Sequence, residues 1–241
     1  MGLLPKSTIE QLKREKREAK AAKKRKERTR QQIVRFLIVC EGEKTEPNYF
    51  KSLINDKYSE VRKEKIRGEG RSTCALVRRT LEIKNELEKT RQLRFDRVWV
   101  VFDKDDFNDF NEAIEMTERL SFQSAWTNEA FELWYYLHFQ YLDTGVTRQD
   151  YIVKLETEIR KHAGYEMYKY KKNDPEIYDI LNLLGNENFA KESAVRLRKL
   201  FSNDNDYKEH KPCTKVDLLV DELENPEGLL RPRDRETVFC H

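Results

Sequence analysis

Two apolar stretches of this 241-residue sequence end abruptly in acidic side chains. Residues 36–40 are followed by Glu41, and residues 97–102 are followed by Asp103 and Asp105. Short, β-branched apolar runs of this kind are typical of strands that are buried on both faces of a parallel sheet. A carboxylate that follows such a strand lies at the sheet edge where open α/β folds bind their ligands.

Because the carboxyl ends of parallel strands meet at one edge, we expect Glu41, Asp103 and Asp105 to lie close together. Two carboxylates about 4 Å apart repel by roughly 4 kcal/mol at an effective dielectric constant near 20, and burial adds a further cost. A divalent cation would offset this repulsion, and ligands made only of oxygen favour Mg²⁺ or Mn²⁺. The alternative is that these acids cap helices or pair with Lys44 and Lys104.

Strand-like and helix-like segments alternate in the first half of the chain, which predicts a parallel four-stranded α/β sheet flanked by helices. Two further strands are predicted at 61–67 and 121–126. From residue 147 onward the apolar spacing predicts helices only, at 147–162, 175–184, 188–200 and 214–223. We therefore expect a basic helical arm at 1–31, an α/β core at 32–145, and a helical extension at 146–241 that packs on the core.

Positive charge is concentrated in the predicted arm. Residues 1–31 hold 12 Lys/Arg and 4 Asp/Glu, a balance of +8, whereas the whole chain carries only +3. Clustered basic side chains release counterions from phosphates, which favours an arm that binds nucleic acid. The alternative is a solvated arm that becomes ordered only with a partner. The candidate phosphate contacts are Lys23, Lys24, Arg25, Lys26, Arg28 and Arg30.

Cysteine usage and hydropathy exclude several classes of protein. The four cysteines are far apart and include no Cys-x-x-Cys pair, so neither a zinc site nor a disulfide framework is expected. Reduced thiols are typical of cytosolic proteins. No apolar run reaches the length of a membrane span, and the first residues lack the apolar segment of a signal peptide. We expect a cytoplasmic protein that does not contact a membrane.

At the two acidic strand ends the sequence resembles the RloB-like family, TOPRIM-domain proteins of prokaryotic anti-phage, abortive-infection and restriction loci. The resemblance rests on Cys-Glu-Gly-x-x-Thr-Glu-x-x-Tyr-Phe at 40–50 and on the strand that ends in Asp103-x-Asp105. It continues at 68–73, 124–139 and 211–216, and spans about residues 35–222. Asn128-Glu129 stands where the family usually has Asn-Pro.

The resemblance implies a TOPRIM-like core and Mg²⁺- or Mn²⁺-dependent chemistry on phosphodiesters. Glu41 would be a metal ligand or general base, Asp103 and Asp105 would hold the metal, and Glu46 would bind a second ion. Such ions activate a water molecule and stabilise the charge that develops on the phosphate. Lys44 would neutralise a phosphate or the leaving oxygen, although an ordinary surface lysine fits its position equally well.

The resemblance therefore predicts a metal-dependent endonuclease that cuts RNA or DNA as an effector of anti-phage defence. Members of the family occur beside an AAA- or ABC-type ATPase, so such a partner is expected. The first alternative is a non-catalytic nucleic-acid-binding or regulatory subunit of an ATPase-containing complex. The second is a different phosphotransfer reaction, such as primase-like polymerisation or phosphohydrolysis. Assembly into a homo-oligomer is compatible with each of these functions.

Two other features of the sequence favour a structural interpretation. Glu132 and His138 lie six residues apart on one predicted helix, and therefore do not share a face. The alternation of tyrosine and lysine at 165–172 would allow stacking on nucleic-acid bases, but tyrosines that pack the helical extension are the simpler interpretation.

Overall fold

A computed structural model describes residues 34–56, 62–69, 73–92, 94–104 and 108–229. The predicted basic arm at 1–31 lies outside the described residues, together with its six candidate phosphate contacts. Asp105 also lies outside them, so its predicted role as a metal ligand stays a prediction.

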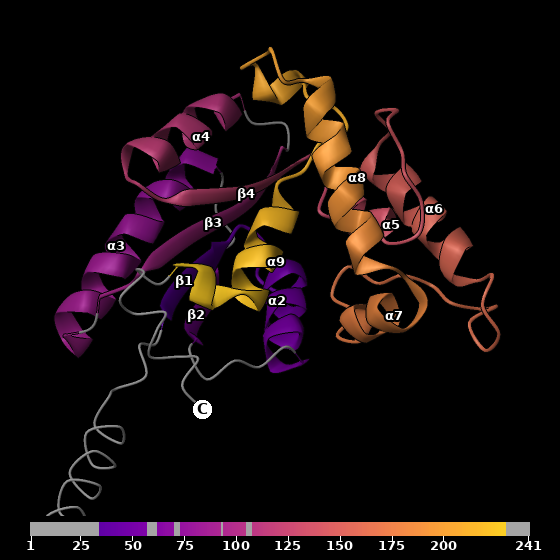
Figure 1. Cartoon of the computed structure of the whole chain (residues 1–241), viewed down its shortest axis with the longest axis horizontal. Coiled ribbons are helices and arrows are strands. Elements are labelled where there is room, and N and C mark those ends of the chain that lie inside the picture. The colour runs from indigo at the N-terminus through magenta and orange to yellow at the C-terminus, as the bar shows by residue number, and fades with distance from the viewer. Residues whose placement is uncertain (1–33, 57–61, 70–72, 93, 105–107, 230–241) are drawn as a thin grey trace, which may run out of the picture. The chain divides into compact units, whose positions relative to one another are not determined.

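Four parallel strands form one sheet in the order β2-β1-β3-β4 (Figure 1). The strands are β1 (Val34–Cys40), β2 (Arg62–Gly68), β3 (Arg97–Lys104) and β4 (Gln123–Asn128). This confirms the predicted parallel four-stranded sheet. Cys40 of β1 is in register with Val101 of β3, so the carboxyl ends of these two central strands meet at the same edge.

Helices cover both faces of the sheet (Figure 1). α3 (Thr73–Arg91) contacts β1 and β3, and α4 (Phe110–Arg119) contacts both α3 and β4. On the opposite face, α2 (Thr45–Asp56) contacts β2 and α9 (Val216–Glu224) contacts β4. The cover of the sheet is thus completed by a helix from the end of the described chain.

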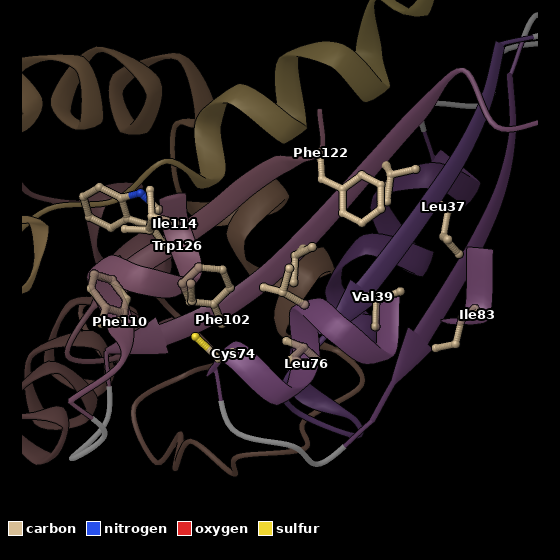
Figure 2. Packing of buried hydrophobic residues seen from close by; sticks show 14 of the residues in the cluster. Leu37, Val39, Cys74, Leu76, Ile83, Phe102, Phe110, Ile114, Phe122 and Trp126 are labelled. Atoms are coloured by element: carbon tan, nitrogen blue, oxygen red, sulfur yellow. The ribbon is translucent and has the colours of Figure 1, made fainter. Parts of the chain in front are cut away.

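The alternation of side chains along the strands explains why both faces are covered. Leu37 and Val39 of β1 and Phe102 of β3 point toward α3 and α4 (Figure 2). Val98 and Val100 of β3 belong to the same buried cluster. Trp99, at an intervening position of β3, instead donates its indole N–H to Glu222 of α9 at 3.0 Å. Successive strand residues point to opposite faces, so an apolar run of this length needs helices on both.

The region after β4 is helical, as predicted. It contains α5 (Glu132–Leu137), α6 (Arg148–Ile159), α7 (Ile177–Leu184) and α8 (Glu187–Leu200), followed by two short 3₁₀ helices, η1 (Tyr207–Glu209) and η2 (Pro226–Leu229), on either side of α9. α5 contacts α6 and α8, and α7 contacts α2. None of the helices in the described ranges is long and apolar enough to cross a membrane.

Candidate active site

Glu41 and Asp103 meet at the carboxyl edge of the sheet. The backbone N–H of Glu41 donates to the carbonyl of Val101 at 2.8 Å, which continues the pairing of β1 with β3 past Cys40. Oε2 of Glu41 accepts the backbone N–H of Asp103 at 3.0 Å. Glu41 therefore holds the end of β3 with both its backbone and its side chain. The sequence had predicted that Asp103 follows the strand. The strand instead continues through Lys104, so Asp103 lies inside β3.

Asp103 is only 8% exposed, and its two carboxylate oxygens have different surroundings. Oδ2 accepts the N–H of Phe131 at 3.0 Å and lies 3.4 Å from a guanidinium nitrogen of Arg148. Oδ1 is buried and has no hydrogen-bond partner among the described residues. Burial raises the pKa of Asp103 well above its ordinary value, and the carboxylates of Glu46 and Glu132 raise it further, whereas Arg148 lowers it.

Glu46, in the first turn of α2, is a second buried carboxylate at this edge and is 6% exposed. Its Oε2 atom also lacks a hydrogen-bond partner in the described part of the chain. Burial raises the pKa of Glu46, while hydrogen bonds from its own N–H and from Gly42 lower it. A Cβ atom at residue 42 would overlap the carboxylate of Glu46, so this packing requires glycine at the turn.

Glu132, at the start of α5, is a third acid of the group and is 3% exposed. Its Oε1 atom accepts the hydroxyl of Tyr170 at 3.0 Å, and its Oε2 atom lies 4.0 Å from Nε of Arg148. Edge-to-face packing of Phe131 on Tyr49, with ring centroids 5.8 Å apart, joins the start of α5 to α2. The sequence signal for Glu132 was its place as the single charged residue in the apolar run 130–137.

Among the described residues, Arg148 forms the ion pairs with Asp103 and Glu132 of this acidic group. It is the first residue of α6, whose start is set by a capping box between Thr147 and Asp150. The N–H of Arg148 donates to the Glu129 side chain at 3.1 Å. Glu129 has a φ of 80°, a value that the fixed ring of proline cannot adopt.

Comparison with protein-family models identifies the family of this chain. A model described as RloB-like protein matches residues 36–223, which is most of the sequence. The chain belongs to the RloB-like family. Comparison with curated proteins and comparison with solved structures each returned no match. The acidic group and Arg148 lie inside the matched range of this RloB-like protein, and the predicted basic arm lies outside it.

The cation beside Asp103 in this RloB-like protein is Arg148, rather than Lys44 or Lys104. Lys44 is exposed on the turn that follows β1. The alternative that the acids cap helices holds for Asp103, but at a different helix from the one that follows it in the chain. Asp103 does not cap α4, which follows it in the chain, but accepts the N–H of Phe131 at the start of α5.

The donor chemistry of the group fits a hard divalent cation. Oδ1 of Asp103 and Oε2 of Glu46 are buried carboxylate oxygens without a partner among the described residues, and such oxygens are suitable ligands for Mg²⁺ or Mn²⁺. Within the same described ranges, no three His, Cys, Asp or Glu side chains converge closely enough to form a ready metal cluster. The metal site predicted at Glu41, Glu46, Asp103 and Asp105 thus stays a prediction, and the described part of the chain offers the unpartnered oxygens of Asp103 and Glu46 for it.

His138 lies apart from this group. Its Nδ1 atom lies 2.9 Å from the carbonyl of Trp134, and the two rings pack edge to face. The imidazole lines a small cavity of about 30 Å³ together with Tyr49 and Glu187. Burial lowers the pKa of His138 to about 4, so the ring is neutral near pH 7.

Proposed function

We propose that this RloB-like protein is a metal-dependent nuclease that hydrolyses phosphodiester bonds of RNA or DNA with Mg²⁺ or Mn²⁺, as a cytoplasmic effector of prokaryotic anti-phage defence. The proposal is carried by two buried carboxylate oxygens, one of Asp103 and one of Glu46, that lie at the carboxyl edge of the sheet and have no hydrogen-bond partner among the described residues. Burying such groups is unfavourable unless a cation compensates them. The resemblance to TOPRIM-domain proteins of defence loci supports the same function.

In this proposal the bound ion supplies an activated water molecule and stabilises charge on the phosphate. Asp103 and Glu46 would hold the ion. Glu41 orients Asp103, because it accepts the N–H of that residue at the end of β3. Arg148, whose side chain is 36% exposed, would bind a non-bridging phosphate oxygen, and the exposed Lys44 would offer a second positive charge on the neighbouring turn.

Cleavage assays with labelled RNA, single-stranded DNA and duplex DNA test this proposal. We expect cleavage with Mg²⁺ or Mn²⁺, none in EDTA, and a loss of roughly 100-fold or more in Asp103→Asn and in Glu46→Gln. Asp96→Asn is the matched control, because Asp96 lies at the opposite edge of the sheet, where it accepts the N–H of Arg35 at 2.8 Å. Wild-type cleavage rates in both site variants would refute the proposal.

One observation favours the second candidate, a non-catalytic nucleic-acid-binding or regulatory subunit of an ATPase-containing complex. Oδ2 of Asp103 is already engaged by Phe131 and Arg148, which is also what a structural acid would show. This candidate predicts nucleic-acid binding that weakens steeply with salt, persists in Asp103→Asn and is lost when residues 1–31 are removed. Metal-dependent cleavage by the purified chain would exclude it.

A further inference from the structure

A segment of the helical extension, residues 168–172, is attached to the acidic group on two sides. The hydroxyl of Thr45, at the start of α2, donates to the carbonyl of Lys172. The hydroxyl of Tyr170 donates to Oε1 of Glu132 on α5 at 3.0 Å. Since α2 also carries Glu46, the segment contacts both helices that supply acids to the candidate site.

The backbone of segment 168–172 is held by further hydrogen bonds from α6 and the turn that follows it. Nε of Arg160 donates to the carbonyl of Tyr168 at 2.7 Å. The N–H of Tyr170 donates to Oε1 of Glu156 at 2.9 Å. The Tyr170 ring packs on Tyr135 with centroids 6.2 Å apart. The segment is therefore a fixed part of the surface beside the site.

Side chains alternate along this segment. Tyr168 and Tyr170 are half-buried, whereas Lys169, Lys171 and Lys172 are exposed. In the ranges that the structure describes, none of the three lysines forms an ion pair. Within the described part of the chain, this held backbone segment thus carries three exposed lysines without an ion pair, which together are called the lysine row.

The acids closest to these lysines in sequence are engaged within the protein. Asp174 accepts the hydroxyl of Tyr168 at 3.0 Å, and Glu166 accepts the N–H of Gly164 at 3.0 Å. At the other end of the lysine row, the carbonyl of Lys172 accepts the hydroxyl of Thr45, the residue before Glu46, and the charge of Lys172 lowers the pKa of Glu46.

We propose that Lys169, Lys171 and Lys172 bind the phosphodiester backbone of a nucleic acid and guide it to the acidic site. This inference rests on the proposed function, because it assigns the substrate-binding surface of that same site. The acidic group repels a polyanion, and a row of cations beside it offsets that repulsion. The contacts are with phosphates, so binding is independent of sequence, and the tyrosines serve packing rather than base stacking.

The test replaces the three lysines together, as Lys169→Gln/Lys171→Gln/Lys172→Gln, in the full-length chain. Binding of fluorescent single-stranded RNA, single-stranded DNA and duplex DNA is measured by anisotropy in EDTA at several salt concentrations. For single strands we expect affinity to fall about 10-fold to 100-fold and the slope of log K against log salt to decrease by about 2. The three probes show which kind of nucleic acid supplies the phosphates.

A matched variant, Lys89→Gln/Arg91→Gln/Arg94→Gln, removes three exposed positive charges elsewhere. The N–H of Phe95, just before β3, donates to Glu88 near the end of α3 at 3.0 Å, so these charges lie at the amino edge of the sheet. This variant should bind like the wild type. Unchanged binding by the lysine variant, or an equal loss in both variants, would overturn the inference.

Binding in EDTA separates this inference from the proposed nuclease activity. If the wild type cleaves with metal but the lysine variant binds as tightly as the wild type, the binding surface is wrong and the nuclease proposal stands. If no nucleic acid is cleaved but the lysine variant loses affinity and salt slope, the nuclease proposal fails and the binding surface stands.

Discussion

Two buried aspartates of this protein, Asp103 and Asp217, each face an arginine, but only one of them is fully paired. Both oxygens of Asp217 accept separate guanidinium nitrogens of Arg198, at 2.5 and 2.7 Å. Arg198 also donates to the carbonyl of Thr214 at 2.7 Å. Asp103 lies 3.4 Å from its arginine, and its Oδ1 atom has no partner in the described part of the chain. Asp217 thus forms a closed ion pair, whereas Asp103 keeps one carboxylate oxygen that could bind a ligand.

The groups next to the two aspartates also have opposite effects on the carboxyl pKa. Burial raises the pKa of both carboxyl groups. For Asp217 the next largest effect is the hydrogen bonding of Arg198, which lowers the pKa. For Asp103 the next largest effects are the charges of Glu46 and Glu132, which raise the pKa further. A buried acid among other acids stores unfavourable energy that a cation can relieve, and this distinguishes a candidate site from a structural pair.

The largest expected effect comes from breaking the closed pair. Asp217→Asn should lower the free energy of unfolding by about 3 kcal/mol, because Arg198 would keep its place without a compensating charge. Urea denaturation measures this. The control is Asp221→Asn on the same helix, an exposed acid that contacts Lys191 and should cost less than about 1 kcal/mol. Equal losses in both variants would contradict the assignment of Asp217 as a structural acid.

Asp103→Asn should affect cleavage strongly and the free energy of unfolding little. Removing one of several mutually repelling carboxylates in EDTA should leave the free energy of unfolding unchanged or raise it by up to about 1 kcal/mol. Cleavage with metal should meanwhile fall roughly 100-fold. Urea denaturation and cleavage assays on the same preparation check both parts. A destabilisation as large as that of Asp217→Asn would show that the two aspartates have the same structural role.

A third buried group, His138, shows the effect of burial apart from that of pairing, because no acid in the described part of the chain is among the causes of its pKa shift. Its pKa is lowered from 6.5 to about 4 by burial. Between these values the unfolded chain binds a proton that the folded protein does not, so stability falls as the pH falls below about 6.5. The loss should reach about 2 kcal/mol at pH 5. The difference between wild type and His138→Gln across pH 5 to 8 isolates this effect, and a constant difference would refute it.

The smallest expected effect on stability concerns Glu132, which contacts Arg148 as Asp103 does. Tyr170→Phe keeps the ring on Tyr135 but removes the hydroxyl that donates to Glu132, and should lower the free energy of unfolding by about 1 kcal/mol. Tyr168→Phe removes a similar bond to the less buried Asp174 and should cost less. Thermal denaturation of the two variants decides between them, and a larger loss in Tyr168→Phe would contradict the ranking.

The contact between Glu41 and Asp103 could be predicted from sequence, because both acids follow apolar runs whose parallel strands must end at one edge. The positions of Arg148 and Tyr170 could not be predicted, and Glu132 stood out only as a single charge in an apolar run, not as a neighbour of Asp103. They come from the helical region, and their positions depend on packing between aromatic side chains that are distant in sequence. The strand that carries Asp103 is also longer than its apolar run, because β4 pairs with β3 as far as Lys104.

The close packing of Gly42 against Glu46 offers a criterion for sorting relatives by sequence alone. Any side chain at the position of Gly42 would displace the buried carboxylate, whatever else the protein retains. A relative that keeps the acid but has lost the glycine must therefore hold that acid elsewhere. Within the RloB-like family, we expect relatives that keep both this glycine and this glutamate to keep the carboxylate in the position seen here.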